Sequence, residues 1–342
     1  MTQLTTAFLG VAHIHTPGFI GTLNKRANEI RVKAVHDHQE ERGRRRAGEM
    51  PGAQFVADPQ DIFDDPEITS VVICAETVRH RDLVTRAARA GKHLFVEKPL
   101  GLGAEDSRAM ADAIRAAGVT FQTGFAMRSG GVSRFITREV QAGHLGRITR
   151  VRYSNCHQAA LAGWFDTEWR WLTDPKLAGG GAFLDLGAHV LDQIVHIFPK
   201  TEGEVTHVAA SLGNRGGRYG TQIDEYGTGL LTFASGASAV LEASWIDPQL
   251  RSPLEVFGTE GQIQVKDGGL FYYSQHVEGM DGKTPVTGLS PQAPHAFDQF
   301  WDALLGRELP VPLVPVEEAA QGSALMERLY HAAGRSTTTG LE

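Results

Sequence analysis

The chain has 342 residues, a formal net charge of −7 at pH 7, 42% hydrophobic residues, 21% charged residues and 39 glycines. This length can bury two cores, and the composition is typical of a globular protein with many tight turns. The negative charge and the lack of a clustered basic face argue against nucleic acid or an anionic membrane as the main partner. They favour a small molecule.

The sequence indicates neither export nor membrane insertion. The first residues, MTQLTTAFLGVAHIH, carry no basic group ahead of their short apolar run. No stretch approaches the roughly 18 uninterrupted apolar residues of a membrane-spanning helix. The two cysteines, Cys74 and Cys156, have no second thiol or histidine at metal-ligand spacing, so we expect them to be reduced core residues. We therefore expect a cytoplasmic protein without a metal site.

Short β-branched runs alternate with helical patterns in the first part of the chain, which is typical of βαβ units and a parallel sheet. Strands are expected at 5–9, 30–36, 54–56, 70–74, 93–96 and 120–123. Helices are expected from Pro17 onward, over 79–90 and over 104–117, with Gly91 and Gly118 closing the last two. This order predicts a dinucleotide-binding, Rossmann-type domain over residues 1–124.

After this point the pattern changes to longer alternating strands separated by glycine turns. Strands are expected at 148–153, 205–212, 226–233, 237–245, 254–258 and 262–266, and helices at 132–142, 182–197, 293–305 and 316–332. The pattern predicts a second α/β domain with a mostly antiparallel open sheet over residues 125–342. We expect its last helix to pack back on the first domain.

The turn after the first strand carries a degraded form of the dinucleotide motif. Its residues are Gly10, Val11, Ala12, His13, Ile14 and His15, where G-x-G-x-x-G brings a pyrophosphate close to a helix N-terminus. Ala12 adds one methyl group at the second glycine, and His15 replaces the third small residue. The alternative interpretation is an ordinary strand-to-helix turn.

Asp37 follows the second strand, where a carboxylate can bind the adenine ribose, and this favours NAD. A basic stretch follows at Arg42, Arg44, Arg45 and Arg46. An arginine here can meet the 2′-phosphate of NADP, which leaves NADP open, but a solvated helix face is the expected role of most of the four.

Two further segments carry candidate chemistry. Lys98, in Glu97-Lys98-Pro99, stands at the carboxyl end of the strand over 93–96, on the rim where open α/β sheets bind ligands. Asp185 and His189 are four residues apart in a helix that follows a glycine turn, so they share one face, and an imidazole can accept a hydroxyl proton near neutral pH. The alternatives are a surface lysine and a solvent-facing polar pair.

The chain resembles the glucose–fructose oxidoreductase, inositol dehydrogenase and rhizopine-catabolism family (Gfo/Idh/MocA) over nearly its whole length. The segments that carry the resemblance are 70–80, 90–100 with Glu-Lys-Pro, 124–128, 143–146, 169–170, 179–192 with Asp-x-Gly-x-His, 258–261 and the closing helix. The degraded glycine motif departs from the family pattern.

The resemblance implies a catalytic set of Lys98, Asp185 and His189, and an NAD site. The cofactor residues expected from the motifs and the resemblance are Gly10, Ala12, His13, Ile14, Asp37, Ala75, Glu76, Thr77, His80, Glu97 and Lys98. Residues that precede or flank the catalytic helix are candidates for the substrate pocket: Arg128, Asn155, His157, Trp164, Trp169 and Arg170. The resemblance also implies a homodimer or homotetramer.

The leading functional hypothesis is an NAD(P)-dependent dehydrogenase or reductase for a secondary hydroxyl or carbonyl of a sugar, inositol or related polyol. One alternative is a glycosidase or lyase of the same fold that retains its NAD. The other is a non-catalytic nucleotide-binding regulator, and the presence of Lys98 and His189 argues against it.

Overall fold

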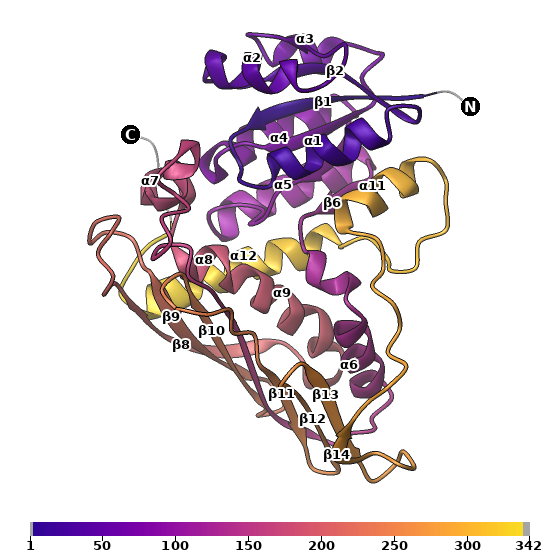
Figure 1. The fold of residues 1–342 in the computed structure, drawn as a ribbon, viewed down its shortest axis with the longest axis vertical. Helices are drawn as coiled ribbons and strands as arrows, with labels where there is room; N and C mark the ends of the chain where they lie inside the picture. Colours follow the sequence, from indigo (N-terminus) through magenta and orange to yellow (C-terminus); the bar gives the residue numbers. More distant parts are fainter. Residues whose placement is uncertain (1–2, 338–342) are drawn as a thin grey trace.

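The computed structural model describes residues 3–337, and these form two α/β halves with a sheet each (Figure 1). The predicted fold class is confirmed: a parallel sheet comes first and a mostly antiparallel sheet follows. No helix within residues 3–337 has the length and apolar character needed to cross a bilayer.

The first sheet has six parallel strands in the order β3-β2-β1-β4-β5-β6. Its strands are β1 (Leu4–Val11), β2 (Ile30–His36), β3 (Gln54–Phe55), β4 (Ser70–Cys74), β5 (His93–Val96) and β6 (Phe121–Thr123). Its connections contain α1 (Thr16–Lys25), α2 (Glu40–Gly48), α3 (Gln60–Asp64), η1 (Thr77–Arg79), α4 (His80–Arg89) and α5 (Ala104–Ala117). The strand order reverses beside β1, so the carboxyl ends of β1 and β4 border the crevice where such sheets bind ligands.

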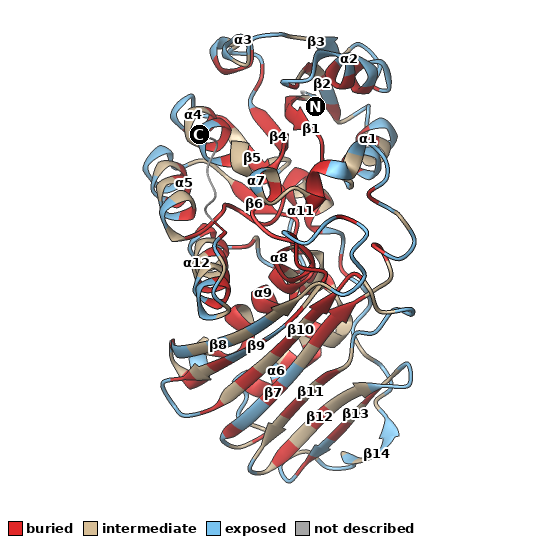
Figure 2. Cartoon of the chain, turned by 90° about the vertical axis from the view of Figure 1, so that its left-hand side faces the viewer, coloured by how far each residue is buried: buried red, intermediate tan, exposed pale blue. Residues whose placement is uncertain are grey.

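The second sheet has eight strands in the order β14-β13-β12-β11-β7-β10-β9-β8, and only the β7–β10 pair is parallel. Its strands are β7 (Ile148–Cys156), β8 (Val205–Gly213), β9 (Tyr226–Phe233), β10 (Ser238–Ser244), β11 (Leu254–Gly258), β12 (Gly261–Lys266), β13 (Gly269–Ser274) and β14 (Asp281–Pro285). The last two strands were not predicted, because glycine and polar turns surround β13, and β14 itself contains a glycine and a proline. Figure 2 shows the open face of this sheet, with buried and less buried positions alternating along its strands.

Helices α8 (Ala182–Asp185), α9 (Gly187–Ile197) and α12 (Val316–Ala332) pack on the other face of this sheet (Figure 1). The other helices of the second half are η2 (Ala126–Ser129), α6 (Gly131–Gln141), η3 (Glu168–Thr173), α7 (Pro175–Ala178), α10 (Pro199–Glu202) and α11 (Ala296–Leu304). The single helix predicted over 182–197 is divided at Leu186. Side chains bind the backbone carbonyls at this break: Lys98 Nζ lies 3.4 Å from the backbone oxygen of Asp185, and Asn155 Nδ2 donates to Leu186 O at 3.2 Å.

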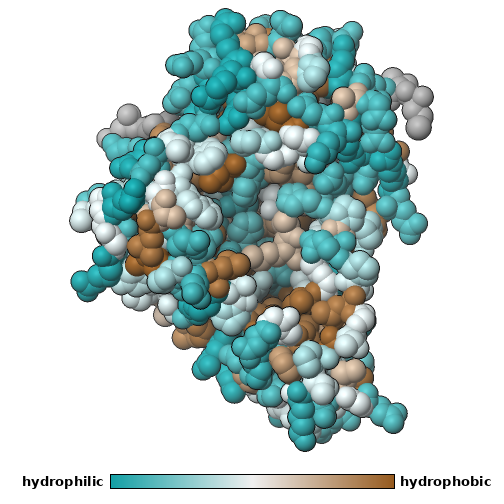
Figure 3. Space-filling view, in the orientation of Figure 1, coloured by the Kyte–Doolittle hydropathy of each residue, from teal (hydrophilic) through white to brown (hydrophobic). Residues whose placement is uncertain are grey.

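Two C-terminal helices pack against the first half. The aromatic side chains of Phe297, Phe300 and Trp301 on α11 join the apolar core formed by β1, β2 and β5. Helix α12 packs on α5, where Glu327 accepts the Ala104 amide at 3.0 Å. In Figure 3, hydrophilic side chains dominate the surface of the first half, and the most extensive hydrophobic patch lies lower in the view, on the second half.

Candidate active site

Lys98 and Asp185 meet where the two halves face each other. Lys98 follows β5, and its Nζ lies 2.5 Å from Asp185 Oδ1. The Lys98 side chain is 2% exposed and that of Asp185 is 20% exposed, so the carboxylate forms the more open side of the pair. Burial alone would raise the pKa of Asp185, but the Lys98 ammonium holds it well below its usual range. Asp185 is therefore ionised.

A carboxylate distant in sequence fixes the start of α8, which carries Asp185. The buried Asp224 accepts the backbone N–H groups of Gly181 and Phe183 at 2.9 and 2.8 Å. Tyr330, on α12, donates its hydroxyl to the same carboxylate at 2.8 Å. These bonds satisfy amides that are free at any helix start, and they define the position of Asp185.

His189 lies in the first turn of α9, beside the Lys98–Asp185 pair. Its Nδ1 is buried and has no hydrogen-bond partner within residues 3–337. Burial, with the nearby Lys98 charge, lowers its pKa to about 3. The imidazole is therefore neutral at physiological pH and keeps a lone pair available. The structure thus brings Lys98, Asp185 and His189 together.

Trp245, which sequence reasoning assigned only to the end of a strand, completes this cluster. Its indole Nε1 donates to Asp185 Oδ2 at 3.1 Å, and the residue is fully buried. No local pattern marks this contact, because it joins the end of β10 to a helix 60 positions earlier in the chain.

Two of the predicted substrate residues, Asn155 and His157, come from the end of β7 on the same side. The charges of Asp185 and Lys98 both act on His157, and burial lowers its pKa. The ring of His157 lies 5.0 Å from that of Trp164, which is 42% exposed. An exposed indole beside the cluster provides a flat apolar surface.

The other three predicted substrate residues have different surroundings. Arg128 is buried, and its guanidinium binds Asp192, His196 and Glu318. Arg170 lies over the ring of Tyr219 at 4.7 Å, and Trp169 packs against the core, where its Nε1 has no hydrogen-bond partner among the described residues 3–337. The structure does not join Arg128 or Arg170 to the Lys98 cluster.

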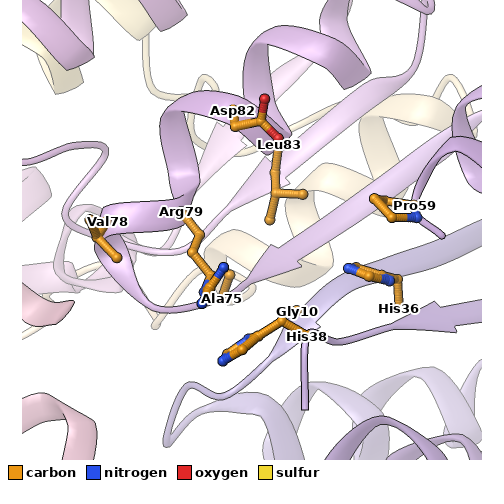
Figure 4. Close-up of a pocket in the computed structure, with 9 residues that line it drawn as sticks. All are labelled: Gly10, His36, His38, Pro59, Ala75, Val78, Arg79, Asp82 and Leu83. Carbon is orange, nitrogen blue, oxygen red and sulfur yellow. The ribbon is translucent and has the colours of Figure 1, made fainter. Parts of the chain in front are cut away.

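The carboxyl ends of β1, β2 and β4 enclose a cavity of about 310 Å³. Figure 4 shows its lining residues: Gly10, His36, His38, Pro59, Ala75, Val78, Arg79, Asp82 and Leu83. Gly10 has φ +82°, and a Cβ on it would lie 2.4 Å from that of Ala75, so only glycine fits there. Two buried atoms near this cavity, Glu76 Oε2 and Arg79 Nε, have no hydrogen-bond partner within residues 3–337. These two atoms lie 3.4 Å apart as an ion pair, and the space beside them fits the adenosine end of a dinucleotide.

Asp37 lies behind this cavity and not in its lining. Its carboxylate accepts the amides of Val11 and Gln39 at 2.9 and 2.8 Å and binds Arg42 through Nε and a terminal nitrogen at 3.0 and 2.7 Å. Arg42 also reaches Glu76 at 2.8 Å. Arg42 and Arg46 are thus buried, which corrects the expectation of a solvated face for these two; Arg44 and Arg45 are exposed.

The remaining predicted cofactor residues have different surroundings. His13, Thr77 and Lys98 border a cavity of about 10 Å³, which has room for no more than one water molecule. Ala12 O accepts the indole N–H of Trp171 from η3 at 3.0 Å, and Ile14 packs against the core of the second half. His80 is buried, with its nitrogens 3.1 and 3.2 Å from the carbonyls of Leu100 and Ala75.

The fully buried Glu97 lies beside two histidines of the turn after β1, His13 and His15. Its Oε1 lies 3.1 Å from His15 Nδ1, its Oε2 lies 3.8 Å from His13 Nδ1, and its Oε2 accepts the Lys98 amide. Three such groups within 4.8 Å of one another could hold a metal ion. However, His13 Nδ1 already accepts the His15 amide at 3.3 Å, and His15 Nδ1 is engaged by Glu97. Hydrogen bonds within the cluster account for its geometry.

Each half of the chain matches the model of a known protein family. The first half matches the model for the oxidoreductase family with an NAD-binding Rossmann fold over residues 4–125, and the second matches the GFO/IDH/MocA C-terminal domain over residues 134–264. The chain is 28% identical to 1,5-anhydro-D-fructose reductase of Ensifer adhaerens, covering 75% of this chain and 73% of that protein. It is 29% identical to scyllo-inositol 2-dehydrogenase (NAD(+)) of Bacillus subtilis, covering 79% and 75%.

Solved structures share the fold. Levoglucosan dehydrogenase in complex with NADH and levoglucosan has a TM-score of 0.76 at 21% identity, with 97% of this chain and 98% of that chain covered. An NAD-binding oxidoreductase from Klebsiella pneumoniae has a TM-score of 0.76 at 21% identity, with 97% of both chains covered. The cavity at the carboxyl ends of β1, β2 and β4 thus belongs to an NAD-binding Rossmann domain.

Proposed function

Because the chain belongs to the GFO/IDH/MocA oxidoreductase family, we propose that it moves a hydride between NAD and a secondary hydroxyl or carbonyl of a sugar, inositol or related polyol. One observation carries this proposal: an ammonium, an ionised carboxylate and a neutral imidazole with a free Nδ1 converge beside the nucleotide-binding sheet. The curated relatives that act on an anhydrosugar and an inositol support the substrate class.

Each group has a separate role in the oxidation. His189 is neutral, so it can take the hydroxyl proton through its free lone pair. Lys98 donates a hydrogen bond to the same oxygen as negative charge develops there, and Asp185 holds the ammonium in place. When bound, NAD supplies the hydride acceptor at nicotinamide C4.

The cofactor preference follows from the charges around the adenosine cavity. Asp37 and Glu76 share the guanidinium of Arg42, so its positive charge is already neutralised and is not available to a 2′-phosphate. Arg79 lines the cavity but lies 3.4 Å from Glu76. We expect NAD to bind more tightly than NADP.

The substrate class suits the groups beside Lys98. A sugar or cyclic polyol has apolar C–H faces and a ring of hydroxyls, and Trp164 offers an exposed indole next to the His157 imidazole. Asn155 lies near the end of β7, two residues before His157, and its side-chain amide donates a hydrogen bond to Leu186 O. We therefore place substrate stacking on Trp164 and hydroxyl recognition on His157.

The test is a screen of NAD and NADP reduction against sugars, anhydrosugars and inositols, together with NADH and NADPH oxidation by the corresponding keto forms. We expect a change in absorbance at about 340 nm with at least one polyol, and a faster rate with NAD. Substrate consumption without net NADH would favour the glycosidase or lyase alternative. Tight NAD binding without any turnover would favour a nucleotide-binding regulator.

A further inference from the structure

The two oxygens of Asp185 have different partners. Oδ1 faces the ammonium of Lys98 at 2.5 Å, and Oδ2 accepts the indole N–H of Trp245 at 3.1 Å. An indole nitrogen donates a hydrogen bond and cannot accept one. The contact at Oδ2 therefore uses a lone pair of that oxygen, and it is stronger when the carboxylate is ionised.

Trp245 is itself held rigidly. Its backbone N–H donates to Glu225 O at 2.8 Å, and its carbonyl accepts the amide of Ala160 at 2.9 Å. Its ring lies 4.6 Å from that of Phe165, and no part of the residue is exposed. A side chain anchored in this way can hold a carboxylate in one orientation.

We propose that Trp245 is a positioning residue for the reaction: by donating to Asp185 Oδ2 it keeps this carboxylate ionised and turned toward Lys98, so that the ammonium points at the reacting oxygen. This rests on the proposed function. It also divides the roles in the site, because an Asp185 held between two donors cannot serve as the base. His189, whose Nδ1 is free, takes that role.

Several charged or titratable groups act on Asp185, and each comes from a different element. They are Lys98 after β5, His189 on α9, His13 in the turn after β1, and His157 after β7. Within residues 3–337 the Asp185 carboxylate accepts hydrogen bonds from Lys98 and Trp245, and the Trp245 donor carries no charge. Its removal changes the hydrogen bonding of the carboxylate without adding or removing a charge.

The experiment compares wild-type protein with Trp245→Phe and a matched control, Trp301→Phe. Trp301 is also fully buried, but its Nε1 has no hydrogen-bond partner within residues 3–337. We expect kcat to fall about 10- to 100-fold in Trp245→Phe, the value of a hydrogen bond to a charged group, with NAD affinity within about twofold of wild type. The acid limb of kcat/KM should move to higher pH, because a carboxylate that loses a donor binds protons more readily. Trp301→Phe should show neither change.

A second readout does not depend on turnover. Acetylation of Lys98 by acetic anhydride, followed by peptide mass spectrometry, reports how firmly its ammonium is held, with the exposed Lys283 as internal reference. We expect Lys98 to react several-fold faster in Trp245→Phe than in wild type and Trp301→Phe. If wild-type protein turns over no polyol, the proposed function fails, and the labelling ratio still decides the role of Trp245.

The proposal is overturned if Trp245→Phe keeps wild-type kcat and Lys98 labelling, or if Trp301→Phe loses kcat and speeds labelling equally. Should Trp245→Phe not fold, 3-benzothienylalanine at position 245 replaces the N–H by sulfur in a ring of nearly the same shape. The same losses are expected from that protein. Wild-type behaviour in it would remove the indole N–H from the mechanism.

Discussion

Two buried ion pairs lie close together along the chain and differ in what they leave free. In one, Arg128 uses all of its guanidinium nitrogens on Asp192, His196 and Glu318. In the other, the Lys98 ammonium bonds only to Asp185 among residues 3–337, and an ammonium has three donors. A buried charge therefore does not mark a reactive centre by itself. The spare donor of Lys98, next to an unpartnered imidazole, makes the difference.

The sharpest test of this contrast is Lys98→Met, which removes the ammonium and keeps most of the apolar stem. We expect turnover to fall about 10²- to 10³-fold, as when one donor to a developing oxyanion is lost. NAD affinity should stay within about twofold of wild type. Lys283→Met, at an exposed lysine, is the control. Wild-type turnover in Lys98→Met would remove the lysine from the chemistry.

Arg128→Met tests the opposite side of the comparison. Removing one partner of a buried ion pair leaves uncompensated charge, so we expect the free energy of unfolding in urea to fall by about 3 kcal/mol. Folded protein should keep kcat within a few-fold of wild type. Arg44→Met, on the exposed face of α2, is the control. A raised KM for the polyol with unchanged stability would instead support the predicted place of Arg128 in the substrate pocket.

The titration of His189 should make the stability of the protein depend on pH. His189 has a pKa of about 3 in the folded chain, against 6.5 in the unfolded one, so only the unfolded chain binds a proton there between these values. Its contribution is complete above pH 6.5 and is lost as the pH falls toward 3. His189→Asn does not titrate.

We therefore expect the stability difference between wild type and His189→Asn to shift by about 2 kcal/mol in favour of the variant from pH 7 to pH 5. Urea unfolding at the two pH values measures this shift. His13 titrates in the same range in both proteins, so its effect cancels. His207→Asn, at an exposed histidine, should show no shift. An equal shift in both variants would contradict the assignment.

The smallest expected effect is that of metal removal. Both Nδ1 atoms beside Glu97 are engaged by hydrogen bonds within that cluster, so we expect dialysis against EDTA to change neither turnover nor NAD affinity. Activity that is lost in EDTA and restored by Zn²⁺ would show that His13, His15 and Glu97 hold an ion. His276→Ala, in an exposed histidine–carboxylate pair elsewhere, is the control for nonspecific binding.

The sequence could predict the features that local patterns encode. The apolar run before Lys98 predicts the end of a strand, and the spacing of Asp185 and His189 predicts that they share a helix face. The partners of these residues could not be predicted, because Trp245 reaches Asp185 through the packing of α8 on β10. Likewise Asp37 lies at the expected strand end, but its hydrogen bonds from Arg42 depend on the packing of α2 against β2 and β3. The strand β13 was missed because glycine and polar turns surround it.

The aromatic side chains of α11 belong to the core of the first half, although they come late in the sequence. Phe297, Phe300 and Trp301 come from the C-terminal part, yet they fill the core between β1, β2 and β5. A fragment that stops after Gly124 would leave this apolar surface open to water. The nucleotide-binding half is therefore complete only when α11 has been made, and we expect the two halves to unfold together.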